Sequence, residues 1–406
     1  MEEWKEYKIG EIAQTNVSQY SLSENWQIIQ YLDTGSITMN QISNIGLFNG
    51  NEGLPSRARR KVKKGDIIFS AVRPNLCHYG YMDNPPSNLL VSTGFVVITV
   101  NAKIVDSRFL YYYLTQNDIV NHLHAIGEQA VSTYPTIRPS DIEDLSVFLP
   151  PLYEQKRISS ILYSLDSKIS CNSRINDNLQ HQANTLFKSW FVDFEPFRNG
   201  EFAEAEMGMI PKGWQVVSLI SIAKYLNGLA MQNFRPEEND KGLPVLKIKE
   251  LGQGMSDSSS DRCSSDIAKQ YIVNDGDVIF SWSGTLLVDL WCGGQCGLNQ
   301  HLFKVTSSYY PKWFYYMWTK QHLNNFIQIA KDKAVTMGHI KRGHLEEAKV
   351  LVPTETAMNA MTAIMQPIID EIIDSRIESR RLSQLRDALL PRLMSGELKV
   401  DSLTDE

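Results

Sequence analysis

The strongest constraint on the fold of this chain is a pair of long heptad repeats. Apolar side chains recur at alternating steps of four and three residues from Ile158 to Trp190, and the same seam returns 203 residues later, from Met361 to Leu393. A seam with this period is typical of an amphipathic helix that packs against another helix. Each helix would be about 55 Å long, at ~1.5 Å per residue over about 37 residues. The sequence therefore predicts two copies of one long helix that pair with each other.

Both seams are polar at their centre. Asn172 and Asn176 occupy the middle of the first seam, and Ser375 and Ser379 occupy the same positions of the second. Buried polar pairs fix the register of paired helices, although the alternative is that these side chains face solvent. An antiparallel pairing places Asn172 level with Ser379 and Asn176 level with Ser375. It also brings together the two ends of the segment between the helices, as a compact domain requires.

The duplication extends beyond the helices. Three further pairs of segments match, namely GDIIFS (65–70) with GDVIFS (276–281), FLYYY (109–113) with WFYYM (313–317), and residues 137–150 with 340–353. The segments between these anchors differ completely between the halves. We therefore predict a common scaffold that carries two different binding surfaces, related by a pseudo-twofold axis.

Each half is predicted to be a mixed α/β (α+β) domain. The β-rich runs are residues 27–32, 66–72, 95–100 and 145–150 in the first half, and 244–251, 277–283, 302–306 and 348–353 in the second. Helices are predicted over residues 106–118 and 311–327. Because strands and helices alternate irregularly, a doubly wound parallel sheet is not implied.

The predicted organisation has two globular domains, each followed by a long helix. Its parts are the first domain (1–150), the first spacer helix (151–194), a linker rich in Gly, Pro and charge (195–213), the second domain (214–353) and the second spacer helix (354–397). Pro367 falls inside the second helix, where proline removes a hydrogen bond. That helix is therefore predicted to be kinked near Gln366 or to begin its regular part there, and to fray at Pro391.

Composition narrows the class of protein. The chain of 406 residues has a net charge of −6, which does not indicate general nucleic-acid binding, so any such surface must be local. It has no run of about 18 apolar residues, which predicts no membrane span. A charged N-terminus without a secretory signal and five scattered cysteines fit the cytoplasm. Cys292 and Cys296 are better explained as ordinary thiols than as half of a metal site.

No convincing catalytic motif is present. The segment Asn84-Pro85-Pro86-Ser87 is close to the Asn-Pro-Pro-aromatic motif of enzymes that methylate DNA amino groups, but serine cannot stack on a flipped base. A proline turn between strands explains this segment better. The chain also lacks a Walker loop, HExxH and GxSxG.

A basic run is the clearest candidate for binding. Six of the eight residues 57–64 are cationic in an otherwise acidic protein, and Arg73-Pro74-Asn75 follows the next strand. Guanidinium groups suit phosphates and guanine edges, although a lone basic run is more often a solvated turn. The candidate DNA-binding residues of the first half are Ser56, Arg57, Arg59, Arg60, Lys61, Arg73, Asn75, Tyr134 and Arg138. Those of the second half are Lys247, Lys249, Trp282, Ser283, Gln300, His301, Lys341 and Arg342.

Several stretches resemble the specificity subunit of type I restriction-modification enzymes, and the resemblance covers essentially the whole chain. They are PSRARR (55–60), LPPLYEQKRI (149–158), LFKSWFVDFEPF (186–197), MIPKGW (209–214), LNQHLF (298–303) and LLPRLMSGEL (389–398). The resemblance implies two target-recognition domains that each read one part of a split site in double-stranded DNA.

The resemblance also implies the partners. The paired helices would space the two domains and dock two modification subunits, which carry S-adenosylmethionine and methylate adenine. Restriction subunits, which are the nuclease and translocase, would join them. No cofactor or metal is then expected on this chain, in agreement with its missing catalytic motifs.

Two other hypotheses stay open. The chain would be a self-sufficient adenine methyltransferase if Asn84-Pro85-Pro86 were catalytic, and binding of S-adenosylmethionine by the purified chain alone would favour this. A coiled-coil adaptor that binds no DNA is the third hypothesis.

Overall fold

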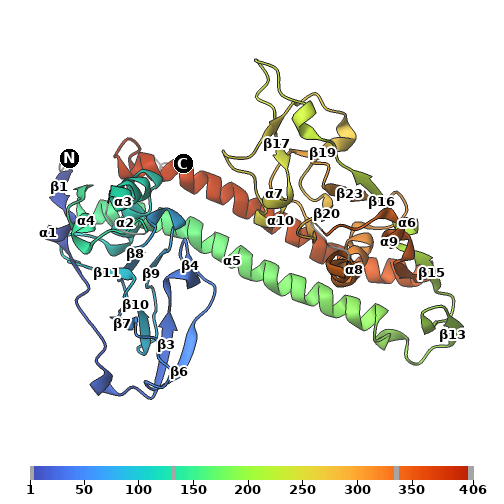
Figure 1. The fold of residues 1–406 in the computed structure, drawn as a ribbon, viewed down its shortest axis with the longest axis horizontal. Coiled ribbons are helices and arrows are strands. Elements are labelled where there is room, and N and C mark those ends of the chain that lie inside the picture. The colour runs from blue at the N-terminus through green and yellow to red at the C-terminus, as the bar shows by residue number, and fades with distance from the viewer. Residues whose placement is uncertain (1–3, 130–133, 333–337, 401–406) are drawn as a thin grey trace. The chain divides into compact units, whose positions relative to one another are not determined.

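The computed structural model describes residues 4–129, 134–332 and 338–400 (Figure 1). By its contacts the chain forms two compact units, the first within residues 1–166 and 384–406 and the second within residues 167–383. The division falls inside both of two long helices, α5 (Leu152–Phe191) and α10 (Glu355–Met394). Each unit therefore combines a globular part with portions of both helices.

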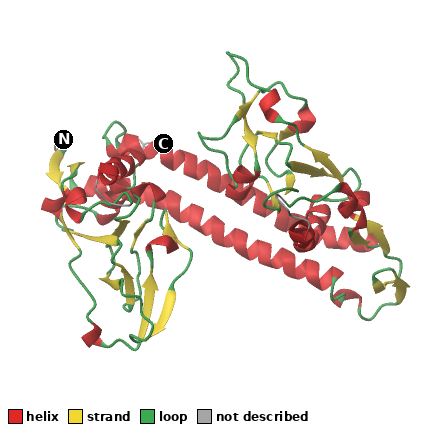
Figure 2. Cartoon of the chain, viewed as in Figure 1, coloured by secondary structure: helices red, strands yellow, loops and turns green. Residues whose placement is uncertain are grey.

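The first unit mixes short strands and helices (Figure 2). Its described strands are β1 (Lys5–Lys8), β2 (Ala13–Thr15), β3 (Ile28–Leu32), β4 (Ile37–Thr38), β5 (Gln41–Ile42), β6 (Gly46–Asn49), β7 (Ala58–Lys61), β8 (Ile67–Ser70), β9 (Tyr79–Tyr81), β10 (Leu89–Ser92), β11 (Phe95–Val100) and β12 (Ser146–Leu149). Its described short helices are α1 (Ile9–Ile12), α2 (Ser107–Leu114), α3 (Asn117–Gln129) and α4 (Pro139–Glu143).

Two four-stranded sheets in this unit have the orders β6-β3-β10-β7 and β2-β11-β8-β9. In the first of these sheets, the central strands β3 and β10 run parallel. The edge strand β6 pairs antiparallel with β3, and the other edge strand β7 pairs antiparallel with β10. The strand β8 is buried on both faces because its side chains alternate between two cores. Ile67 and Phe69 pack in the core that includes α2, and Ile68 packs in the core formed with β10 and Phe95.

The second unit repeats this pattern. Its described strands are β13 (Phe202–Ala205), β14 (Gly208–Pro211), β15 (Gln215–Ser218), β16 (Lys224–Asn227), β17 (Leu243–Leu246), β18 (Arg262–Cys263), β19 (Ile272–Val273), β20 (Val278–Ser281), β21 (Leu287–Leu290), β22 (Cys296–Leu298), β23 (Leu302–Thr306) and β24 (Lys349–Val352). Its described short helices are α6 (Leu219–Ile222), α7 (Ile248–Gln253), α8 (Lys312–Asp332) and α9 (Arg342–Glu347).

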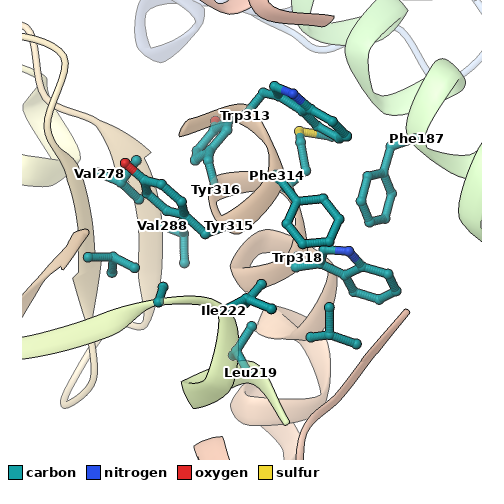
Figure 3. Close-up of a cluster of buried hydrophobic side chains, with 14 of the residues drawn as sticks. Phe187, Leu219, Ile222, Val278, Val288, Trp313, Phe314, Tyr315, Tyr316 and Trp318 are labelled. Atoms are coloured by element: carbon teal, nitrogen blue, oxygen red, sulfur yellow. The ribbon is translucent and has the colours of Figure 1, made fainter. Parts of the chain in front are cut away.

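The sheets of the second unit have the same topology as those of the first. Their orders are β18-β17-β22-β19 and β16-β23-β20-β21, and β17 and β22 form the parallel pair. The aromatic residues of α8 fill the larger core of this unit. Figure 3 shows Trp313, Phe314 and Trp318 of α8 between Phe187 of α5 and the strand residue Val278. The predicted duplication of a mixed α/β scaffold is therefore confirmed.

One local prediction differs from the structure, and one predicted linker contains strands that were not predicted. The run 244–251 was expected to be one strand, but β17 ends at Leu246 and α7 begins at Ile248. The Glu250 carboxylate accepts a hydrogen bond from the Lys247 backbone N–H (3.1 Å), which starts the helix. The predicted linker 195–213 contains the antiparallel hairpin β13–β14, because Gly208 permits the positive φ of its turn.

The long helices pair antiparallel, as predicted. In the second unit, Asn172 Nδ2 donates to Glu378 Oε2 (2.7 Å) and Asn176 Nδ2 donates to Ser375 Oγ (2.8 Å), so rising numbers on α5 meet falling numbers on α10. The predicted pairing of Asn176 with Ser375 is confirmed. Asn172 bonds Glu378 instead of Ser379, whose hydroxyl turns back onto the Ser375 carbonyl oxygen of its own helix (2.8 Å).

The second long helix contains two prolines, and one arginine, Arg386, departs from the apolar pattern of its seam. α10 begins at Glu355 and continues through Pro367, so of the two predicted alternatives, the one in which its regular part begins near Gln366 is wrong, and a kink there stays a prediction. It also continues past Pro391 to Met394. Arg386 interrupts the apolar seam because it forms an ion pair with Asp166 of α5 (2.7 Å) within the first unit. Tyr112 of α2 donates to the other oxygen of the same carboxylate (2.7 Å).

Replacing Asn172, Asn176, Ser375 and Ser379 by leucine should raise the thermal unfolding midpoint of the chain. Asn172, Asn176 and Ser375 are buried, and the buried Asn176 Oδ1 has no hydrogen-bond partner among the described residues. These four residues form a polar layer between the two helices. Replacing the polar side chains of both helices in this layer should increase the free energy of unfolding by about 1–3 kcal/mol and loosen the register of the helix pair. Calorimetry measures the midpoint, and Asn178→Ala, at an exposed position of α5, is the control. A lower midpoint would contradict this account of the layer.

Candidate nucleic-acid interface

The loops that follow β8 and β20 occupy equivalent places in the two units. The strand-ending serines turn back onto these loops, since Ser70 Oγ donates to the Val72 carbonyl (2.9 Å) and Ser281 Oγ donates to the Thr285 carbonyl (2.8 Å). Each loop then forms a bridge with the segment that precedes α4 or α9. The bridges join Val72 to Thr136 and Ser283 to His339. The same backbone arrangement thus presents different side chains in the two units.

The loop after β8 brings Arg73 and Tyr134 together. The Arg73 N–H donates to the Pro135 carbonyl (2.8 Å), and its guanidinium carbon lies 4.6 Å from the centre of the Tyr134 ring. Arg73 adopts a positive φ of 48°, which is uncommon for a residue with a side chain and is held here by these contacts. Exposed Asn75 lies in the following turn, Pro74–Leu76. These three predicted residues form one exposed cluster.

Arg138 lies close in sequence to this cluster, at the start of α4. Its backbone N–H donates to the Asp141 carboxylate (2.6 Å), and its guanidinium contacts the same group (3.2 Å). The side chain is 82% exposed, so the ion pair leaves the guanidinium accessible to a ligand.

The basic run lies on the edge strand β7 and its flanks, and its members differ in their surroundings. Arg57 and Ser56 are exposed, and the Arg57 carbonyl accepts from the Thr93 N–H (2.8 Å). The neighbouring Gly94 carbonyl accepts from the Ala71 N–H (2.8 Å). The adjacent residues Thr93 and Gly94 therefore hydrogen-bond both to the Arg57 backbone and to the loop that leads to Arg73. These backbone contacts place Arg57 on the same side of the unit as the Arg73 loop.

The middle of the run is engaged by the protein itself. Lys61 forms an ion pair with Glu24, and its Nζ lies 5.3 Å from the centre of the Trp26 ring. Arg60 is half-buried, its Nε has no hydrogen-bond partner among the described residues, and burial lowers the pKa of its guanidinium. Arg59 Nη1 donates to the Ala58 carbonyl (3.2 Å). A sequence pattern cannot distinguish these cations from the exposed Arg57.

In the second unit, four predicted residues form one cluster. Trp282 lies 5.9 Å from His301 between ring centres, and the Ser283 hydroxyl is 3.0 Å from His301 Nδ1. Gln300 Nε2 is 3.5 Å from His301 Nε2. The cluster is aromatic and polar where that of the first unit is cationic.

Two asparagines support this second cluster and were missed by the sequence reasoning. Asn227 Oδ1 accepts from the Trp282 indole N–H (2.9 Å), and Asn299 Oδ1 accepts from the His301 backbone N–H (3.2 Å). Asn299 falls within the stretch LNQHLF, which could have indicated it. No local signal marks Asn227, because its partner lies 55 residues away in the sequence.

The other four candidates of the second unit divide into two pairs. Lys341 and Arg342 are exposed at the start of α9, and Arg342 lines a cavity of about 890 Å³ together with Trp282. Lys247 forms an ion pair with Asp261, and Lys249 Nζ lies 3.0 Å from Ser259 Oγ and 3.6 Å from Asp257. These acidic partners reduce the positive charge that the two lysines present.

The residues once considered for metal binding or catalysis have ordinary surroundings. No group of three or more His, Cys, Asp or Glu side chains suitable for a metal occurs in the ranges that the structure describes. Burial raises the pKa of Cys292 to about 11 and that of Cys296 to about 12, so both are neutral thiols at pH 7. Asn84 and Ser87 are exposed in the irregular segment between β9 and β10.

None of the helices searched in the described part of the chain is long and apolar enough to cross a membrane.

Comparisons with known proteins agree with the duplicated architecture. The family model described as the type I restriction modification DNA specificity domain matches residues 1–181 and 211–380. The chain is 25% identical to the type I restriction enzyme HindI specificity subunit of Haemophilus influenzae, with 98% of this chain and 100% of that protein covered. It is 28% identical to the MjaIX specificity subunit of Methanocaldococcus jannaschii, with 97% and 93% covered.

A solved structure supports the fold. The crystal structure of a type I restriction-modification system S subunit from M. genitalium matches with a TM-score of 0.58 at 13% identity, and 96% of each chain is covered. The family model matches well over half of the sequence, in two segments that correspond to the two repeats. The chain therefore belongs to the family of type I restriction-modification specificity subunits and carries two copies of the DNA specificity domain.

Proposed function

We propose that this chain reads a bipartite site in double-stranded DNA, with one half read by each globular part. The observation that carries the proposal is the pair of equivalent loops after β8 and β20. Both are held by the same backbone bridges, yet one presents Arg73 and Tyr134 and the other presents Trp282 and His301. A shared scaffold with unlike side chains at the same place suits two different short DNA words.

The chemistry of each cluster fits a part of DNA. In the first unit, Arg57, Arg73 and Arg138 provide charge for phosphates and forked donors for guanine, and Asn75 can pair with adenine. In the second unit, Gln300 and His301 can form hydrogen bonds with base edges, and Trp282 provides an apolar face for a thymine methyl group. Lys341 and Arg342 would contact phosphates beside them.

The remaining candidates contribute less directly. Lys61, Lys247 and Lys249 already have acidic partners, and Arg60 is half-buried, so we assign these four residues to the flanks of the DNA contact. Ser56 precedes Arg57 in the turn before β7, Arg59 lies on β7, and the Ser283 hydroxyl is placed to orient His301. A phosphate contact at a flank adds affinity without adding sequence information.

The chain would act as the non-catalytic member of a cytoplasmic complex. Exposed apolar side chains on the long helices, at Tyr153, Ile175, Ile364 and Leu385, provide surfaces for two modification subunits. Those subunits would hold S-adenosylmethionine and methylate adenine, and restriction subunits would add the nuclease and translocase. The chain itself would then need no cofactor.

Methylome sequencing tests the proposal. Cells that contain this chain and its modification subunits should methylate one motif, made of two unlike words with bases of no fixed identity between them. Because both words must meet major grooves on one side of the duplex, their centres should lie about one helical turn (~10 bp) apart. Cells with the modification subunits but without this chain are the control. A continuous motif, or the same methylation without the chain, would refute the proposal.

Removing Arg57 and Arg73 should weaken DNA binding and flatten its dependence on salt. Each lost phosphate contact should reduce the slope of log K against log salt by about 0.9, so the double alanine variant should lose about 1.8 if both contact phosphates. Fluorescence anisotropy of the assembled complex at several salt concentrations measures the slope. Lys212→Gln removes one exposed charge that is paired with Glu201 and is the control.

The triple variant with Arg57, Arg59 and Arg60 replaced by alanine extends this measurement to all three arginines of the run. If affinity and slope were unchanged in both variants, the basic run and the Arg73 loop would be solvated turns without a role in binding.

A further inference from the structure

Two arginines of α10 extend into the globular part of the second unit. Arg376 and Arg380 are one turn apart on the helix and therefore share a face. Arg376 Nη1 donates to Asp289 Oδ1 of β21 (3.0 Å) and to the Leu290 carbonyl (3.2 Å). Arg380 binds both oxygens of Asp275 (2.7 and 2.8 Å) and the Cys292 carbonyl (2.5 Å).

These contacts are partly shielded from water. Only 23% of the Arg376 side chain and 17% of the Arg380 side chain are exposed. Burial alone would raise the pKa of Asp275, but hydrogen bonds from Arg380 and the Gly294 N–H outweigh it and hold that pKa below its ordinary value. Both members of the Arg380–Asp275 pair therefore stay charged at neutral pH.

The loop around Arg380 is shaped to the guanidinium group. Gly294 has a φ of +90°, and a Cβ atom at this position would lie 3.3 Å from Arg380 Nη1. The Gly294 N–H also donates to Asp275 Oδ1 (2.8 Å). A bidentate pair of this kind fixes direction as well as distance, whereas the apolar contacts between α8 and the long helices do not.

The first unit attaches to α5 by different chemistry. Here the globular part supplies the cation, since the Arg108 guanidinium lies 3.4 Å from the centre of the Tyr163 ring of α5 and 2.7 Å from Asp83. The positions of α5 that correspond to Arg376 and Arg380, 203 residues earlier, are Ser173 and Asp177. The two arginines are therefore specific to the second copy of the helix.

We infer that Arg376 and Arg380 are positioning residues that set the orientation of the second recognition domain on α10 and thereby the number of base pairs between the two DNA words. This inference rests on the proposed bipartite reading. Without the two arginines, the domain keeps its own fold and its DNA-contacting loop, because neither residue belongs to that loop. Its direction relative to the helix is then fixed by apolar packing and the single hydrogen bond from Trp313 to Thr362 (3.0 Å), which together tolerate more rotation than the bidentate ion pair.

The test uses the full chain assembled with its modification subunits and DNA duplexes that carry both words with gaps one base pair shorter, equal and one longer. Arg376→Gln combined with Arg380→Gln should keep both words but reduce discrimination between gap lengths on the order of tenfold, equivalent to about 1.4 kcal/mol. Arg380→Lys keeps the charge but loses the bidentate geometry and should give a smaller change in the same direction. Arg392→Gln, at an exposed ion pair of α10, should match the unmodified chain.

The outcomes separate the inference from the proposed function. If the unmodified chain reads one continuous word, both are overturned. If it reads two words at one gap length and the folded variants keep the same discrimination, only the positioning role is overturned. Should the double glutamine variant fail to fold, Arg380→Lys decides the question. Combining Asp275→Arg with Arg380→Asp should restore part of the discrimination that either single change removes.

Discussion

Exchanging residues 215–339 for the matching segment of another specificity subunit will change one half of the methylated DNA site and leave the other half and the gap unchanged. The exchanged segment carries the loop after β20, whereas Arg57, Arg73 and both long helices stay in place. Because the two clusters lie in different compact units, the side chains that we propose to read one word should not depend on those that we propose to read the other. The expected result is a complete change of specificity in one word.

The structure adds a condition to this experiment. Asp275 and Asp289 lie inside the exchanged segment, and their partners Arg380 and Arg376 lie outside it. A donor segment must therefore keep aspartates at these positions, or it leaves two half-buried guanidinium groups without partners, which is costly. Methylome sequencing reads the outcome, and the reciprocal exchange of residues 5–137 should change only the other word. A chimera whose motif changed in both halves would contradict the separation of the two units' roles.

Replacing Trp313 by alanine should destabilise the second unit by about 3–5 kcal/mol, the usual cost of removing a large buried aromatic side chain. Trp313 is fully buried and packs 6.1 Å from Trp190 and 5.4 Å from Phe314 between ring centres. Its indole N–H donates to Thr362 Oγ1 of α10 (3.0 Å). One side chain therefore joins α8 to both long helices, and its loss leaves a cavity where all three meet.

Hydrogen exchange of the amides of α8 measures this loss within the second unit, separately from the first. Trp313→Phe keeps most of the apolar volume but removes the hydrogen bond to Thr362, so it should cost about 1 kcal/mol. A loss below about 1 kcal/mol for Trp313→Ala would show that the surrounding residues collapse into the cavity, and the assigned role of Trp313 would be wrong.

The sequence alone determined the features that depend on local periodicity and on internal repetition. The heptad seams predicted α5 and α10, and the matching polar pairs predicted the antiparallel contact between Asn176 and Ser375. The strands β8 and β20 were evident as repeated apolar runs. Such patterns predict helices and strands because the spacing of apolar side chains along one element indicates which of them are buried, without information about distant residues.

Only the tertiary structure decided which polar residues act together. Arg57 and Lys61 belong to the same basic run, yet Lys61 pairs with Glu24 and Arg57 joins the loop of Arg73 through a turn near Thr93. Arg386 interrupts the apolar seam of α10, and its partner is Asp166 of α5. The strength of an ion pair or a stacking contact depends on a distance across the fold. Spacing along the chain does not determine that distance, because the two partners come from different elements that only the fold brings together.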